Sequence, residues 1–512
     1  MHFIMRYRNI LYLFLLLILS LSASSCNDWL EATSSSQVSD KKLFSTRSGF
    51  KEALTGIYLA MGTEDVYGAN YTWRFNDIVC LPYATLAGKA QRAFQQNEFS
   101  LADAMPYIDA MWRGGYHVVA CANKLLYELE QHRDIITDDL EYNLIKGEAL
   151  AARAYVHFDL MRMFGEASWQ GENADKQTIP YVRSYSSAVE PQRTYSQTAE
   201  LLIEDIMAAL KCLEKDPVRG DIPDNFNATI NADAYWSDRQ KHLNYYAVKA
   251  LLARVYLWQD NFAQAYSTAY EVATQAQASQ LVRWLDAEAW AQESEADHKD
   301  WTFSVEHIFS LEVTNLYESL KESFYPGQTT QNGYVLSAEN IESLFRNVPE
   351  YGIQELIEDV RGPAGTMYYR NGGYIINKFY SSNSYDYALR ARMPMIRLSE
   401  MYLIMAQAMA MTFDYAGAGN CLNQIRMHRG LSLSDDQFPA TGGVSTLNDI
   451  MGEYLKETIG EGRFLFAYRN LWRLERDHFH NIVVSVPVNT TPDKMKYPYP
   501  LEEVSYGRVQ DE

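Results

Sequence analysis

Runs of apolar residues at helical spacing constrain the fold of this chain more than any other feature. The clearest run ends at Gly165, a residue that often follows a helix, and its members recur at steps of three and four: Leu140, Leu144, Ala149, Ala152, Tyr155, Val156, Leu160 and Met163. Strand-like alternation is scarce. The same spacing predicts further helices over 105–132, 195–215, 243–259, 262–278, 397–412, 415–428 and 446–476.

These predicted helices come in adjacent pairs with short breaks. Only Asp260 and Asn261 separate 243–259 from 262–278, and such hairpins are typical of tetratricopeptide units, although the full repeat consensus is absent. We therefore expect a mainly α fold, a tetratricopeptide-like helical hairpin scaffold with long irregular loops. Because the irregular stretches are rich in aromatic residues, we expect them to be ordered and functional; they cover 62–100, 165–194, 216–242, 279–395 and 429–445.

The N-terminus has the features of an export signal. Arg6 and Arg8 precede a short apolar run, Ile10 to Leu21, which falls below the ~20 residues that a membrane-spanning helix needs. Small residues then lead to Cys26, where a lipoprotein signal peptidase would cleave and a lipid would be attached. We predict a lipoprotein signal peptide over 1–25, a lipidated tether over 26–40 and one helical domain over 41–512. The alternative is an ordinary secreted protein with an incidental cysteine.

Charge and cysteine spacing exclude some partners. The formal net charge of -20 leaves no basic surplus for nucleic acid. Cys80, Cys121, Cys212 and Cys421 form no C-x-x-C pair, so no metal site or cofactor is predicted. One or two disulfides among these cysteines are an alternative. Cys121 and Cys212, however, lie in helical patterns and suit small buried hydrophobic positions. The two imidazoles of His478-Phe479-His480 would share a helix face poorly.

Several motifs, in a fixed order, resemble those of the SusD/RagB-type lipoproteins of Bacteroidetes, and the resemblance runs from Cys26 to the C-terminus. The motifs are Trp112 with Tyr116 and 122–126, then 146–155 with 158–165, 250–257, 396–404, 422–426 and 461–464. The chain departs from the family pattern at Ala406-Gln407-Ala408, where a Glu is usual, and at 452–457, where the family is rich in Arg. These departures leave the fold expectation intact.

The resemblance implies a role as well as a fold. It implies a lipid-anchored, surface-exposed protein of the outer membrane that binds an oligosaccharide and delivers it, as a hinged lid, to a SusC-like TonB-dependent transporter barrel. It also implies a binding protein rather than an enzyme. Peptide nutrients in place of glycans are the alternative. A surface hydrolase is a further alternative, because a glycosidase needs only two carboxylates and no motif excludes them.

Charged residues within the apolar helical motifs favour a structural role over catalysis. A guanidinium packed among helices needs a carboxylate to offset its desolvation, and we expect Arg397 to pair with Glu400. The other members of this set are Arg153, Arg254, Arg426, Glu461 and Arg463.

Aromatic residues in the irregular stretches are the predicted ligand site. The chain is 13% aromatic, and the apolar face of a pyranose packs on a flat ring while polar side chains bind its hydroxyls. Family members commonly bind sugar with loops in two regions, which here contain Tyr71, Trp73, Arg74, Asn76 and Asp77 in the first and Trp284, Trp290 and Trp301 in the second. The alternative for Trp73 is that it only holds its loop against the helices.

Overall fold

The computed structural model describes most of the chain downstream of the predicted tether. Its described residues are 41–86, 88–220, 222–295, 298–314, 316–324, 333–347, 355–356, 358–379, 392–431, 443–475, 477, 488 and 490–507. The chain divides into two compact units, Met1–Glu52 and Ala53–Glu512. In the first unit the described residues lie around the start of α3 (Arg47–Met61). The predicted signal peptide, Cys26 and His478 to His480 fall outside the described residues.

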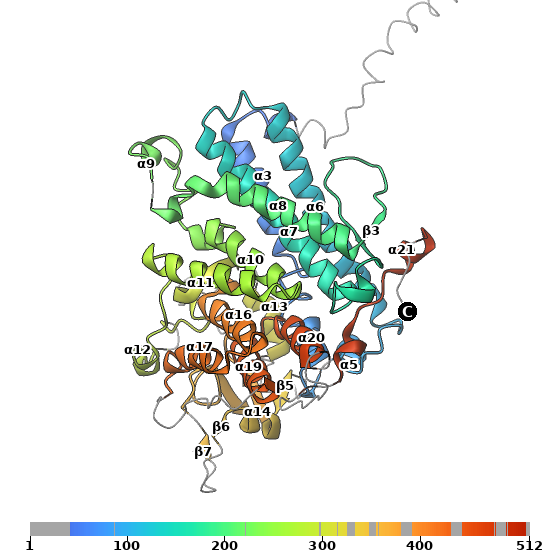
Figure 1. The fold of residues 1–512 in the computed structure, drawn as a ribbon, viewed down its shortest axis with the longest axis vertical. Coiled ribbons are helices and arrows are strands. Elements are labelled where there is room, and N and C mark those ends of the chain that lie inside the picture. Colours follow the sequence, from blue (N-terminus) through green and yellow to red (C-terminus); the bar gives the residue numbers. More distant parts are fainter. Residues whose placement is uncertain are drawn as a thin grey trace, which may run out of the picture. The chain divides into compact units, whose positions relative to one another are not determined.

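Long helices that pack pairwise dominate the second unit (Figure 1). Along the chain, α6 packs on α7 and α7 on α8; α10 packs on α11, α11 on α16 and α16 on α17, with α10 also on α8 and α19 on α16. The long helices are α6 (Met105–Gln131), α7 (Asp139–Phe164), α8 (Tyr195–Cys212), α10 (Tyr245–Trp258), α11 (Phe262–Ala278), α16 (Leu398–Met411), α17 (Tyr415–Met427), α19 (Gly443–Thr458) and α20 (Phe464–Leu474). The predicted helical hairpin scaffold is therefore confirmed.

Local sequence signals set where these helices begin. The carboxylate of Asp138 accepts the backbone N–H groups of Leu140 and Glu141 at the start of α7. At the start of α8, Thr194 and Gln197 form a reciprocal capping box. Such caps satisfy N–H groups that have no partner within the helix, so the helix start is fixed by the sequence itself.

One predicted helix is wrong. The range 446–476 is two helices, because α19 ends at Thr458 and α20 begins at Phe464. The break contains Gly460 at φ 86° and Gly462 at φ 67°, left-handed values that side-chain-bearing residues rarely adopt. The apolar pattern continues across the break and hides it.

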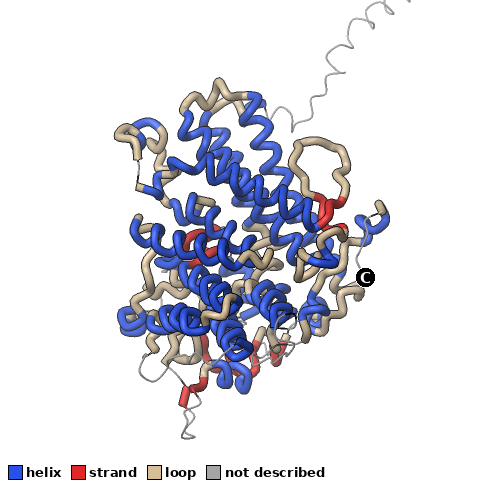
Figure 2. Tube along the Cα trace, in the orientation of Figure 1, coloured by secondary structure: helices blue, strands red, loops and turns tan. Residues whose placement is uncertain are grey.

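Short elements fill the stretches between the long helices, and Figure 2 shows how small the strands are. Four strands form an antiparallel sheet in the order β1-β5-β9-β8, and β10 pairs with β4, β2 with β3, and β6 with β7. The strands are β1 (Tyr83–Thr85), β2 (Gln177–Pro180), β3 (Gln192–Thr194), β4 (His307–Glu312), β5 (Val335–Ser337), β6 (Arg346–Asn347), β7 (Glu355–Leu356), β8 (Met367–Arg370), β9 (Gly373–Ile376) and β10 (Arg392–Arg397). The short α-helices are α4 (Phe75–Cys80), α5 (Lys89–Gln95), α9 (Phe226–Thr229), α12 (Ala287–Gln292), α13 (Leu316–Phe324), α14 (Ala338–Leu344) and α21 (Leu501–Ser505). The 3₁₀ turns are η1 (Gly171–Asn173), η2 (Leu213–Lys215), η3 (Pro217–Arg219), η4 (Arg239–Lys241), η5 (Ser304–Glu306) and η7 (Pro492–Met495).

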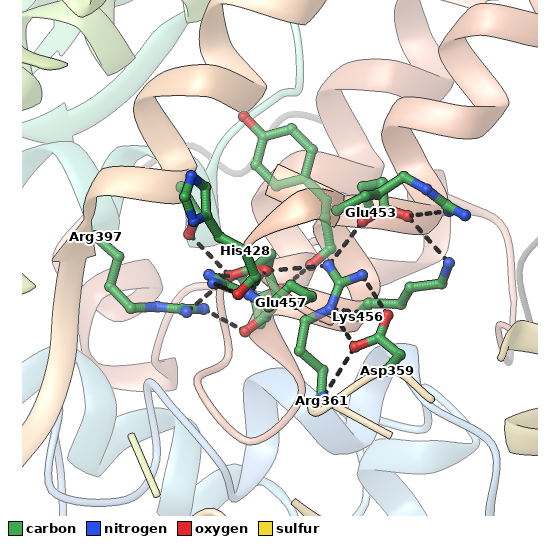
Figure 3. Close-up of polar contacts among 12 residues, drawn as sticks. Asp359, Arg361, Arg397, His428, Glu453, Lys456 and Glu457 are labelled. Atoms are coloured by element: carbon green, nitrogen blue, oxygen red, sulfur yellow. Dashed lines mark hydrogen bonds and ion pairs between the residues drawn. The ribbon is translucent and has the colours of Figure 1, made fainter. Parts of the chain in front are cut away.

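A network of buried charges centres on Glu457 of α19 (Figure 3). Its carboxylate accepts hydrogen bonds from Arg397 at 2.7 Å, Arg429 at 2.7 Å, Arg361 at 3.0 Å and Ser399 at 2.8 Å. Burial alone would raise the pKa of Glu457, but the guanidinium groups of Arg429, Arg397 and Arg361 hold it well below its usual range. The network therefore joins β10, the end of α17 and α19 through paired charges.

The predicted pair between Arg397 and Glu400 is wrong, although both side chains are paired. Arg397 binds Glu457 and Glu461, and Glu400 binds Arg254 of α10 at 2.5 Å. Arg397 is the last residue of β10 and has extended backbone angles, φ -121° and ψ 158°. Its side chain therefore does not share a helix face with Glu400.

Cys80 and Cys421 are buried, and Cys121 and Cys212 are half-buried; all four are free thiols. Among the described residues, no helix combines the length and the hydropathy needed to span a bilayer.

Candidate functional site

The first predicted ligand region begins with a compact series of turns between α3 and α4. Its backbone is bonded to itself, for example from Gly68 N–H to the Thr63 carbonyl at 2.9 Å and from Arg74 N–H to the Ala69 carbonyl at 3.0 Å. A Cβ at Gly68 would lie 2.4 Å from the Gly62 carbonyl oxygen, so a glycine is needed there. This part of the predicted stretch 62–100 is an ordered loop.

Three of the five predicted residues in this region point into the core. Trp73 is 0% exposed; its indole N–H donates to the Gly68 carbonyl at 3.0 Å, and its ring packs against Phe324 and Tyr334. The Tyr71 hydroxyl donates to the Met111 carbonyl at 2.7 Å. Asn76 donates to the Tyr71 carbonyl at 2.9 Å. In this structure their rings and amide hold the loop against the helices and present no open face to a ligand.

Asp77, the fourth predicted residue, ties the loop to the break between α19 and α20. Its buried carboxylate accepts the backbone N–H groups of Gly460 and, at 2.8 Å, Gly462. Burial raises the pKa of Asp77 to about 7, and these two hydrogen bonds oppose the rise. The same contact thus fixes both the loop and the turn between the two helices.

Arg74, the fifth, is the accessible member of this group and lies on a polar surface. Its guanidinium donates to Glu64 at 3.1 Å and to Asn70 at 3.2 Å. The hydroxyl of Ser319 in α13 donates to the other oxygen of Glu64 at 3.1 Å. We call the surface formed by Glu64, Asp65, Arg74, Tyr107, Arg113 and Ser319 the loop-62 surface.

Electrostatic neighbours and an exposed ring complete the loop-62 surface. Burial and the charge of Glu64 raise the pKa of Asp65, while the guanidinium groups of Arg113 and Arg74 lower it. Tyr107 of α6 is 37% exposed and rests on Phe75, with ring centroids 4.9 Å apart. The surface therefore offers an open aromatic ring together with two guanidinium groups, two carboxylates and a hydroxyl. This combination suits a neutral ligand that is rich in hydroxyl groups.

The second predicted region divides between two places. Trp290 and Trp301 meet edge to face at 5.6 Å inside a buried apolar cluster with Phe303, Leu285, Ala287 and Val360. Trp284 lies elsewhere: it is half-buried, stacks on His428 at 4.6 Å and contacts Tyr402 at 5.0 Å. Of the three predicted tryptophans, Trp284 keeps a substantial part of its side chain accessible.

Sequence reasoning did not select Glu64, Asp65, Tyr107, Arg113 or Ser319. Glu64 and Asp65 belong to the same irregular stretch as Arg74, so the polar composition of that stretch could have added them to the predicted ligand site. Tyr107 and Arg113 lie within a regular helix, and Ser319 is 245 positions from Arg74 along the chain. No local pattern connects them. Among the described residues, no three His, Cys, Asp or Glu side chains gather closely enough to hold a metal ion.

Two protein-family models match this chain over separate ranges. Residues 28–257 match the family model described as "Starch-binding associating with outer membrane", and residues 316–473 match the model of the SusD family. The chain belongs to the SusD/RagB family. A relative within this SusD/RagB group, SusD-like protein P2 of Formosa agariphila, is 25% identical over 202 residues, which are 38% of this chain and 36% of that protein. The match thus spans about a third of that relative.

Solved structures agree with the SusD/RagB fold. A SusD superfamily protein from Bacteroides thetaiotaomicron aligns over 90% of this chain and 98% of its own, with a TM-score of 0.66 and 22% identity. A protein from Bacteroides vulgatus described as a putative sugar binding protein aligns over 83% and 87%, with a TM-score of 0.60 and 21% identity. At these identities the likeness shows the fold alone.

Proposed function

We propose that this SusD/RagB protein captures an oligosaccharide at the cell surface and delivers it to a SusC-like TonB-dependent barrel, without chemistry on the ligand. The observation that carries the proposal is the loop-62 surface, which combines Arg74 of the ordered loop with the exposed ring of Tyr107 on α6. The description of the family model that residues 28–257 match, which names starch binding and association with the outer membrane, supports the same role. So does the sugar-binding description of the similar Bacteroides vulgatus structure.

An alanine substitution of Arg74 tests the binding site directly. We expect Arg74→Ala and Tyr107→Ala each to weaken binding of the best glycan of a panel by about tenfold or more, measured by calorimetry. Arg133→Ala is the matched control, because Arg133 also pairs with a carboxylate, that of Asp139, and lies 4.4 Å from the ring of Tyr142. Equal affinities for all three variants and the natural protein would place the ligand elsewhere.

The same incubations separate capture from the alternatives. Chromatography of each glycan after incubation should show no shorter products, since the proposed role is capture alone. Release of products would support a surface hydrolase. Binding of a peptide mixture, with no glycan bound, would support the peptide alternative.

Lipidation at Cys26 would hold the protein at the outer leaflet. The basic residues, the short apolar run and the small residues before Cys26 support this. We expect a Cys26→Ala protein to leave the membrane fraction. If it remained with the outer membrane and stayed labelled at the surface without its barrel partner, the anchor would lie elsewhere.

A further inference from the structure

A hollow lies on the α16 and α17 hairpin, far along the chain from the loop-62 surface. It has a volume of about 300 Å³ and is lined by Tyr402 and Met409 of α16 and, among others, by Gly417, Asn420, Cys421 and Gln424 of α17. We call it the α16/α17 groove. Its volume falls at the lower end of the range for small-molecule sites, roughly 300–1,000 Å³.

The α16/α17 groove is uncharged. None of its lining residues is acidic or basic, and burial raises the pKa of Cys421 to about 11, so this thiol stays neutral at physiological pH. Its polar groups include three side-chain amides, those of Asn420, Asn423 and Gln424. Those of Asn420 and Gln424 form no hydrogen bond with the described part of the chain. The groove therefore suits a neutral ligand that both donates and accepts hydrogen bonds.

Helix α11, which packs against α16, adds flat aromatic faces close to the groove. Tyr266 and Tyr270 are one helical turn apart, and their rings are nearly parallel, with centroids 6.1 Å and planes 17° apart. Burial raises the pKa of Tyr402, and nearby Cys421 and Tyr270 raise it further, which places Tyr270 close to the groove. Tyr270 is 53% exposed, so one face of the pair is open.

We propose that the α16/α17 groove, with Tyr270 and Tyr266 as its platform, is a second carbohydrate site that takes a neutral pyranose ring. The apolar face of the sugar would pack on the tyrosine rings. Its hydroxyls would bind the amides of Asn420 and Gln424. The site uses none of the residues of the loop-62 surface.

A sugar fits these features better than a peptide does. The backbone groups of α11, α16 and α17 are bonded within their helices, so no strand edge is available to pair with an extended peptide. The lining has no cation for a peptide carboxylate and no anion for its amine. A pyranose has an apolar C–H face and hydroxyl groups around its edge. The parallel tyrosine rings suit the apolar face, and the unpaired amides beside them suit the hydroxyl groups.

Saturation-transfer NMR on the mature protein tests the groove separately from the loop-62 surface. The probes are maltotriose, cellotriose and xylotriose, with a mixture of tripeptides as a separate arm, all at millimolar concentration. The starting protein is the Arg74→Ala variant, in which we expect binding at the loop-62 surface to be weakened by about tenfold or more. We expect a trisaccharide signal to remain in this variant. Adding Tyr270→Ala should lower the affinity obtained from that signal by about three- to tenfold.

The matched control is Tyr127→Ala in the same background. Tyr127 is 47% exposed and, like Tyr270, pairs with another tyrosine, Tyr185 at 5.8 Å, but lies on α6. Its loss should leave the residual signal unchanged. The proposal is overturned if Arg74→Ala gives no signal with any trisaccharide, if Tyr270→Ala and Tyr127→Ala behave alike, or if only tripeptides bind. Unaltered binding by Arg74→Ala, with a full effect of Tyr270→Ala, would overturn the loop-62 site and keep this one.

Discussion

The Glu457 network and the loop-62 surface use the same residue types for different ends. Inside, the carboxylate of Glu457 is surrounded by three guanidinium groups and a hydroxyl, and it is 1% exposed. At the surface, Glu64 pairs with Arg74 and Ser319, and its side chain is 59% exposed. A charged side chain that is fully bonded to protein partners has no hydrogen-bonding group left for a ligand. An exposed charged side chain keeps lone pairs or N–H groups bound to water, and a ligand hydroxyl can replace that water.

This contrast predicts that interior charges control stability and surface charges control binding. Glu457→Gln should have the largest effect, a loss of about 3–5 kcal/mol of unfolding free energy, because it leaves three buried guanidinium groups short of one countercharge. Urea denaturation measures it. Ligand affinity of the folded fraction should not change; weaker binding at full stability would show that this interior charge contributes to the ligand site.

Trp73 belongs to the predicted ligand loop, but its side chain lies in the interior. Trp73→Phe should cost about 2–3 kcal/mol, since the Gly68 carbonyl loses its donor and the smaller ring leaves space. Thermal and urea unfolding check the loss. If glycan affinity fell tenfold with little change in stability, the predicted stacking role of Trp73 would regain support over its role in holding the loop.

Asp77 gives a prediction in pH. Burial raises its folded pKa to about 7 from an ordinary 3.8. A raised folded pKa means that its contribution to stability is fully present below the unfolded value and is lost as pH rises through the folded value. The unfolding free energy of the natural protein, minus that of Asp77→Asn, should therefore fall by about 1.4 kcal/mol per pH unit between pH ~4 and ~7.

That difference is obtained from urea midpoints at several pH values. Asp77→Asn will be less stable in absolute terms, because its amide nitrogen faces one of the two glycine N–H groups. A flat difference across this pH window would show that Asp77 is ionised throughout.

The smallest effect is expected at an exposed pair. Arg183 and Glu204 lie 2.7 Å apart with side chains 39% and 61% exposed, so Glu204→Gln should cost about 0.2–1 kcal/mol and less at high salt. The same urea measurements apply. A cost near that of Glu457→Gln would remove the distinction between interior and surface charges.

Helix positions could be read from the sequence because periodicity and caps are local. The runs over 262–278 and 415–428 match α11 and α17 within a residue. The break at Gly460 could not be read, since glycine alone does not end a helix. The partners of the buried charges could not be predicted from the sequence either. Arg397 pairs with Glu457, 60 residues away, and Glu400 pairs with Arg254, 146 residues away.

The candidate site was harder still to predict. Composition selected the loop around Tyr71 to Asp77 correctly as ordered, but it could not tell which side chains face inward. An alternating pattern would have revealed the faces of a strand; a series of turns has no such period. Only Arg74 of that group proved accessible.

The turn that holds Asp77 has a consequence for how much sequence change the protein tolerates. A Cβ at Gly462 would lie 2.5 Å from the Tyr71 carbonyl oxygen and 2.6 Å from the Thr72 Cα, both backbone atoms that cannot move aside alone. In a saturation library, position 462 should accept almost nothing but glycine. The loop that it touches can still vary at Glu64 or Arg74. The loop-62 surface could thus change in sequence while the contact of Gly462 with Tyr71 and Thr72, which supports its loop, stays the same.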